Sequence, residues 1–170
     1  MKALIVVDMQ VDFVTGALGS ADAVAILPAV TEKVKHFDGA VVFTRDTHEE
    51  GYLDTQEGRR LPVKHCIRGT KGWEICEELA PYAETVIDKP TFGSLALPAL
   101  LKSLGEPLEE ITLCGLCTDI CVISNAMILK AAFPEVPITV DAAACAGVTP
   151  ESHKIALEAM RAVQITVENN

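Results

Sequence analysis

Short apolar runs recur along this chain, and segments with helical spacing of apolar residues separate them. The runs are rich in β-branched residues and predict strands buried on both faces, at residues 3–7, 40–44, 84–88, 110–114, 137–140 and 164–167. The segments between them predict helices at residues 27–37, 73–82, 95–104, 118–131 and 150–163. Strands that alternate with helices indicate a parallel sheet. We therefore expect an α/β protein of three layers (α/β/α), with a six-stranded, mostly parallel, Rossmann-like sheet in the middle.

Proline, glycine and capping residues set the expected ends of these elements. Pro28 falls in the first turn of the first expected helix, and Pro150 falls at the first position of the last one; both places tolerate proline. Thr118 is a suitable N-cap for the helix that carries residues up to 131, and Gly115 predicts a turn before it. Residues 49–72 are polar and contain several glycines, so they predict a long loop, which in a compact domain is usually functional.

Length and charge narrow the class of protein. A chain of 170 residues predicts one domain, residues 1–170. The net charge of −10 argues against nucleic acid or an anionic membrane as partner, because both bind basic surfaces. No apolar run approaches the roughly 20 residues of a membrane span, and the N-terminal segment does not resemble a signal peptide. We therefore expect a cytoplasmic protein whose six cysteines are reduced.

Polar residues follow the expected strands at the edge where parallel sheets bind ligands, outside the carboxyl ends of the strands. They lie far apart in the sequence but are expected to meet there: Asp8, Asp46 with His48, Lys89 and Cys121. No G-x-G-x-x-G motif follows the first expected strand, and no G-x-x-x-x-G-K-[ST] motif occurs. The dinucleotide and P-loop interpretations therefore lose support.

Cys121 is a candidate nucleophile. It lies in the first turn of an expected helix, where free N–H groups and the helix dipole lower the pKa of a thiol and can hold the oxyanion of a tetrahedral intermediate. Asp8 as base and Lys89 as a nearby cation would complete a triad for attack on an amide carbonyl. The alternative is structural: Asp8 ends a strand, Lys89 is solvated, and Cys121 is a small core residue.

A second group of residues has the composition of a metal site. Asp46 and His48 face the same way in an extended segment, and the loop can bring His65 to them. Three such ligands with open positions are typical of a reactive or substrate-binding metal. The alternative is a pair of exposed loop histidines. Phe13, in the loop after Asp8, either stacks on a planar substrate or packs within the loop.

Cys114 and Cys117 form a C-x-x-C pair, which leaves a redox or structural-zinc interpretation open. There is no second such pair, and the first cysteine lies in an expected buried strand. Only Cys121 lies clearly at a helix start, where a redox nucleophile is expected. This interpretation is therefore weaker than the hydrolytic one.

The motifs together resemble those of the isochorismatase-like cysteine hydrolases, and most closely the nicotinamidase/pyrazinamidase branch. The resemblance covers nearly the whole chain in the right order. The matching segments are Val6-Val-Asp-Met-Gln-Val-Asp-Phe-Val, Asp46-Thr-His, Lys64-His-Cys-Ile-Arg-Gly-Thr, Asp88-Lys-Pro-Thr-Phe-Gly-Ser and Gly115-Leu-Cys-Thr-Asp-Ile-Cys-Val.

The resemblance implies a role for each matching residue. Asp8 would be the general base, Lys89 the catalytic lysine and Cys121 the nucleophile. The metal ligands would be Asp46, His48 and His65, holding a divalent ion, Zn²⁺ first and Fe²⁺ or Mn²⁺ as alternatives. The family further implies an isochorismatase-type fold, a homo-oligomer, a cis peptide at Leu116–Cys117, and an oxyanion hole from the backbone N–H groups of Cys117 and Cys121.

The expected activity is hydrolysis of a small amide through a Cys121 thioester, with release of ammonia. The first substrate to consider is nicotinamide. Nicotinamidases usually carry a tryptophan three residues before the third metal ligand, whereas this chain has Pro62 there. The alternatives are another small amide, ureide or carbamoyl substrate, or a non-catalytic ligand-binding protein of the same fold.

Overall fold

The computed structural model describes residues 1–105 and 107–170 of the chain. It contains one six-stranded sheet, and strand β1 (Lys2–Val7) lies near the middle of this sheet. The strand order is β3-β2-β1-β4-β5-β6, and all neighbouring pairs are parallel. The other strands are β2 (Ala40–Asp46), β3 (Val86–Lys89), β4 (Glu110–Leu116), β5 (Ile138–Ala146) and β6 (Thr166–Glu168). The expected six-stranded parallel sheet is confirmed.

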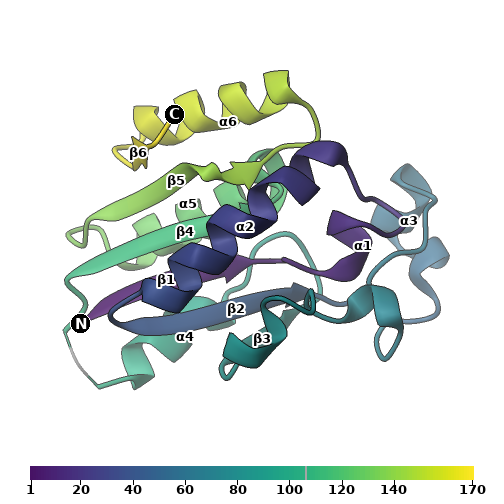
Figure 1. Cartoon of the computed structure of the whole chain (residues 1–170), viewed down its shortest axis with the longest axis horizontal. Helices are drawn as coiled ribbons and strands as arrows, with labels where there is room; N and C mark the ends of the chain where they lie inside the picture. The colour runs from purple at the N-terminus through teal and green to yellow at the C-terminus, as the bar shows by residue number, and fades with distance from the viewer. Residues whose placement is uncertain (106) are drawn as a thin grey trace.

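Helices cover both faces of this sheet (Figure 1). Helix α2 (Ala21–His36) crosses one face and packs on β4 and β5. On the other face α5 (Ile123–Ala132) lies between α4 (Ala96–Ser103) and α6 (Pro150–Ala162). Because both faces are covered, residues 3–7 of β1 are completely buried. No helix in the described part of the chain is both long and apolar enough to cross a membrane.

The first expected helix begins earlier than the sequence indicated. Helix α2 starts at Ala21 because the Ser20 hydroxyl caps it, accepting a hydrogen bond from the Ala23 N–H at 3.0 Å. Pro28 therefore lies inside the helix and not in its first turn. The last helix is as expected, with Thr149 as N-cap and Pro150 at its first position.

The segment between β2 and β3 also differs from expectation. The expected loop at 49–72 contains a 3₁₀ turn (Tyr52–Asp54) and α3 (Gln56–Arg60). The expected helix at 73–82 is wrong: 3₁₀ turns at Lys71–Trp73 and Ala80–Tyr82 flank Ile75, which bridges to Gln10. Here pairing with the segment after β1, which also forms the short α1 (Val11–Val14), outweighs helix propensity.

The segment from 110 to 122 was predicted with the wrong boundaries. Gly115 is not in a turn but within β4, at φ +111°, where an added Cβ would lie 2.2 Å from the Val7 carbonyl oxygen, so only glycine fits. A π-helical turn, η4 (Thr118–Val122), precedes α5. Thr118 is not the N-cap; its hydroxyl bonds to the His153 ring at 2.7 Å. Strand β5 runs to Ala146, so Asp141 lies within it.

Candidate active site

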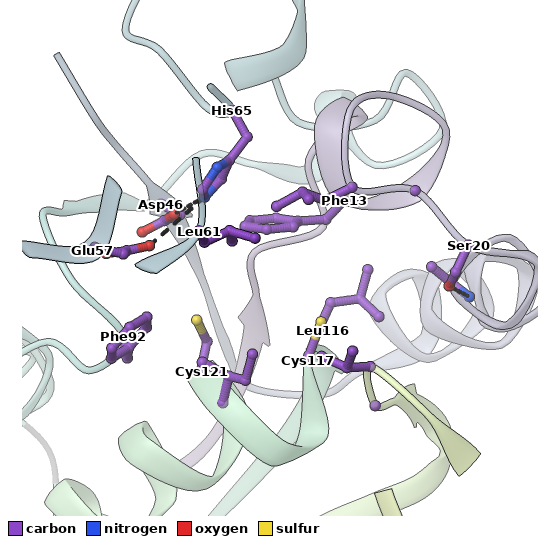
Figure 2. A pocket seen from close by; sticks show the side chains of 16 residues that line it. Phe13, Ser20, Asp46, Glu57, Leu61, His65, Phe92, Leu116, Cys117 and Cys121 are labelled. Carbon is purple, nitrogen blue, oxygen red and sulfur yellow. Dashed lines mark hydrogen bonds and ion pairs between the residues drawn. The ribbon is translucent and has the colours of Figure 1, made fainter. Parts of the chain in front are cut away.

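The predicted catalytic residues meet where the strand order reverses between β1 and β4. Asp8 directly follows β1, Lys89 ends β3, and Cys121 lies in η4 after β4. In doubly wound sheets this switch point is where ligands bind. A cavity of about 530 Å³ opens there, and Figure 2 shows the Cys121 sulfur directed into it.

The Lys89 ammonium connects the predicted catalytic residues. Its Nζ lies 2.7 Å from the Asp8 carboxylate and 3.3 Å from the Asp46 carboxylate. It also donates to the Thr91 carbonyl at 3.1 Å and to the Cys121 sulfur at 3.4 Å. The lysine is fully buried, so the alternative of a solvated lysine is wrong.

Burial and neighbouring charge set the ionisation of this group. Burial raises the pKa of Asp8, and the Lys89 charge opposes this without cancelling it. Burial alone would lower the pKa of Lys89, but the charges of Asp8, Cys121 and Asp46 together raise it, so the ammonium stays charged. Thr44, which the sequence did not indicate, donates to the other Asp8 oxygen at 2.7 Å.

Cys121 is a buried thiol in this structure. Burial raises its pKa well above the usual value, and the Asp8 charge adds to this while Lys89 opposes it. The expected lowering of the pKa at the helix start is therefore outweighed by burial, so the sulfur needs a base to take its proton. Asn125, also missed by the sequence, holds the turn by donating to the Cys121 carbonyl at 2.8 Å and accepting from the Ser94 N–H at 2.9 Å.

The turn before Cys121 has the cis peptide bond that the family resemblance implies. The Leu116–Cys117 peptide is cis. The Cys117 carbonyl accepts bonds from the N–H groups of Ile120 and Val122. Within the described residues the Cys117 N–H has no acceptor, and this residue lines the cavity. That N–H is thus free to bind a substrate oxygen.

Asp46, His48 and His65 come together as predicted, and Glu57 of α3 joins them. The four ligand atoms lie within 4.8 Å of one another. The His48 Nε2 lies 2.9 Å from Asp46 and 3.6 Å from Glu57, and the His65 Nε2 lies 3.6 Å from Asp46. The sequence reasoning missed Glu57, since an acidic residue in a polar segment gives no spacing signal until α3 is recognised.

This group fits a divalent cation. The His48 Nε2 is buried and has no hydrogen-bond partner among the described residues. His65 directs Nε2 to the group because its Nδ1 bonds the Val63 carbonyl at 2.8 Å. Burial would raise the pKa of Asp46, but the adjacent imidazoles of His48 and His65 and the charge of Lys89 lower it overall, so the carboxylate is ionised. Nitrogen and oxygen donors of this kind suit Zn²⁺, Fe²⁺ or Mn²⁺.

The remaining cavity lining is mostly apolar. Phe13 lies in it, with its ring 5.5 Å from that of His65, and Leu61 and Phe92 line it further (Figure 2). Pro62 is exposed and is not among the lining residues, and neither is Trp73. Phe13, Leu61 and Phe92 therefore form an apolar part of the cavity wall.

The C-x-x-C pair does not form a disulfide. All six cysteines are free thiols. Cys114 is fully buried inside β4, and burial raises its pKa to about 12. Burial likewise raises the pKa of Cys117 to about 12. Neither is a reactive thiolate, which disfavours the redox interpretation.

The fold and the site define the class: a doubly wound α/β protein with a buried cysteine, lysine and aspartate beside a candidate metal group. The chain matches the isochorismatase domain over residues 2–169. The isochorismatase family protein PncA of Bacillus subtilis (strain 168) is 32% identical over 142 residues, 74% of this chain and 76% of that protein. The chain belongs to the isochorismatase family.

Solved structures narrow the class further. A pyrazinamidase of Pyrococcus horikoshii in complex with zinc has a TM-score of 0.85 and 31% identity, covering 98% of this chain and 97% of that chain. The N-carbamoylsarcosine amidase from Thermoplasma acidophilum has a TM-score of 0.80 and 26% identity, covering 98% and 94%. This protein is a hydrolase that acts on C–N amide bonds.

Proposed function

We propose that this hydrolase converts nicotinamide to nicotinate and ammonia through a Cys121 thioester. The observation that carries the proposal is the arrangement in Figure 2, in which the cysteine sulfur faces an apolar cavity with the candidate metal group beside it. A flat heteroaromatic amide suits such a space, since its ring contacts apolar side chains while its amide reaches the nucleophile.

Asp8 serves as the base and then as the acid. It takes the thiol proton as the Cys121 sulfur attacks the amide carbon, and the Cys117 and Cys121 N–H groups bind the oxyanion. Asp8 then gives the proton to the departing nitrogen, and ammonia leaves. Water hydrolyses the thioester, losing a proton to Asp8 that returns to the sulfur. Lys89 favours the ionised states of both partners because it contacts each of them.

A divalent ion would be held by Asp46, His48, Glu57 and His65. When bound, it would supply a Lewis acid that orients the ring nitrogen of the substrate. We propose Zn²⁺, because the similar pyrazinamidase of Pyrococcus horikoshii is in complex with zinc; Fe²⁺ and Mn²⁺ have the same ligand preferences.

The charge of the cavity favours a neutral substrate. Among the described residues, no lysine or arginine lines it, and the carboxylates that line it are those of Asp46 and Glu57. With a divalent ion bound, the charges of Asp46 and Glu57 are balanced, and the lining offers no lysine or arginine to pair with a substrate carboxylate. Anionic carbamoyl compounds are thus the second candidate class, supported by the similarity to the N-carbamoylsarcosine amidase.

The remaining expectations also stay proposals: one domain over residues 1–170, a cytoplasmic location and a homo-oligomer, with no nucleic acid or membrane partner. The net charge of −10 supports the last point.

The test is ammonia release by zinc-loaded protein from nicotinamide, pyrazinamide, benzamide and N-carbamoylsarcosine. We expect release from the first two, less from benzamide, which lacks the ring nitrogen, and none from the anionic compound. Cys121→Ala should abolish release. Cys145→Ala is the matched control, since Cys145 is buried in β5 and does not line the cavity. Full activity of Cys121→Ala would refute the thioester route.

A further inference from the structure

The pairing of strand β2 with β1 ends just before Asp46, the first residue of the candidate metal group, whereas its pairing with β3 continues there. Strand β1 pairs with β2 up to Val7 and Thr44, and the Asp8 N–H donates the last bond, to the Thr44 carbonyl at 3.2 Å. Asp46 lies further along β2 and is buried. On the side where β1 has ended, the buried N–H and carbonyl of Asp46 need other partners, because leaving them unpaired costs free energy.

The side-chain amide of Gln10 takes the place of the missing strand. Its Oε1 accepts from the Asp46 N–H at 2.7 Å, and its Nε2 donates to the Asp46 carbonyl at 2.8 Å. The other Nε2 hydrogen goes to the Trp73 carbonyl at 2.9 Å. Gln10 is fully buried, so water does not compete for these bonds. An amide is needed, because a carboxylate cannot donate and an apolar side chain can do neither.

The Trp73 segment holds the residues on either side of Asp46. The Trp73 indole N–H donates to the Thr47 hydroxyl at 2.9 Å, and the Arg45 guanidinium lies 3.4 Å above the Trp73 ring. The single tryptophan of the chain thus supports the end of β2 instead of contacting the cavity. Gln10 links this support directly to the Asp46 backbone.

The position of Asp46 matters because its carboxylate contacts both the Lys89 ammonium and a histidine of the candidate metal group. One oxygen lies 3.3 Å from the Lys89 ammonium, and the other lies 2.9 Å from the His48 Nε2. A small rotation of the backbone at Asp46 would move both contacts. We infer that Gln10 is a positioning residue whose amide fixes the Asp46 backbone and thereby aims its carboxylate at the metal. The inference rests on the proposed metal role of Asp46.

The test is a Co²⁺ titration of metal-free protein, followed by visible absorption, which reports both affinity and coordination. Gln10→Met keeps the length of the side chain and removes all three bonds. We expect its Co²⁺ dissociation constant to rise by about 10- to 100-fold, as for other partners that orient metal ligands, with a changed absorption band. Gln10→Glu keeps the acceptor for the Asp46 N–H but loses both donated bonds, so it should also weaken binding.

Two controls separate positioning from general damage. Gln164→Met makes the same chemical change in an exposed turn, and Ile111→Val perturbs the core at the far end of β4; both should bind Co²⁺ as the parent does. Alkylation of Cys121 by iodoacetamide in the metal-free protein should be unchanged in Gln10→Met, because Lys89 keeps its contacts with Asp8 and Thr91.

The outcomes distinguish the inference from the proposed function. If the parent protein binds Co²⁺ and Gln10→Met binds it with the same affinity and the same absorption band, the positioning role is overturned. The metal centre itself is then retained. Parent protein that binds no Co²⁺ overturns the metal centre and the inference with it. If the rate of Cys121 alkylation changes by the same factor as the Co²⁺ dissociation constant, the inference is also overturned, because this result shows unspecific disruption of the site. If Gln10→Met does not fold, Gln10→Glu is judged by the same criteria.

Discussion

The hydrogen bond from Thr44 to Asp8 allows a sharp test of the general base. The Thr44 hydroxyl donates to an Asp8 oxygen at 2.7 Å, and both residues are fully buried. Thr44→Val keeps the shape of the side chain and removes the donor. A hydrogen bond to a carboxylate stabilises its charged form, so its loss favours the protonated form and raises the pKa of Asp8 further.

The expected shift in the pKa of Asp8 follows from the strength of the hydrogen bond that Thr44→Val removes. Hydrogen bonds to charged groups contribute about 1.5–3 kcal/mol. Since a change of about 1.4 kcal/mol corresponds to one pH unit, the acid limb of the pH profile of kcat/KM should move up by about one to two pH units. At a fixed pH on this limb fewer molecules hold an ionised Asp8, so activity falls there, and it recovers as the pH rises.

The assay is ammonia release from nicotinamide measured across pH for the parent, Thr44→Val and Thr112→Val. Thr112 is a buried threonine of β4 that pairs with Leu4, away from Asp8, so its variant should keep the parent profile. An unmoved acid limb in a folded Thr44→Val protein would mean that Asp8 is not the base whose ionisation limits the reaction.

Three further substitutions test other parts of the site. Lys89→Met leaves the buried carboxylates of Asp8 and Asp46 without their cation, so the free energy of unfolding in urea should fall by about 3–5 kcal/mol; unchanged stability would contradict the ion-pair network. Glu57→Gln removes one negative ligand, and Zn²⁺ affinity measured by competition with a chelator should weaken by about 10-fold or more, whereas an equal affinity would exclude Glu57 from the metal group. Asn125→Leu removes the acceptor of the buried Ser94 N–H and the side-chain donor to the Cys121 carbonyl, so it should cost about 1–3 kcal/mol and lower kcat; a fully active and stable variant would refute its support of the cysteine turn.

The sequence predicted the sheet and the meeting of the catalytic residues because both depend on simple rules. Apolar β-branched runs identify buried parallel strands, and the carboxyl ends of such strands share one edge. The sequence therefore predicts correctly that Asp8, Asp46, Lys89 and Cys121 meet at this edge.

Features that depend on tertiary pairing could not be predicted in this way. Residues 73–82 have a helical composition, but the pairing of Ile75 with Gln10 prevents a helix. Glu57 and Gln10 act through positions that only the folded chain brings close to Asp46. The pKa of Cys121 was expected to fall because of the helix start, yet burial has the larger effect and raises it.

In the proposed reaction, Cys121 forms an acyl intermediate with the amide substrate. The most direct measurement is the intact mass of zinc-loaded protein mixed with nicotinamide and quenched in acid within milliseconds, followed by peptide mapping. We expect a nicotinoyl adduct on the peptide that contains Cys121, absent from Cys121→Ala. Rapid ammonia release with no adduct at any time, and with activity retained in Cys121→Ala, would contradict this reaction.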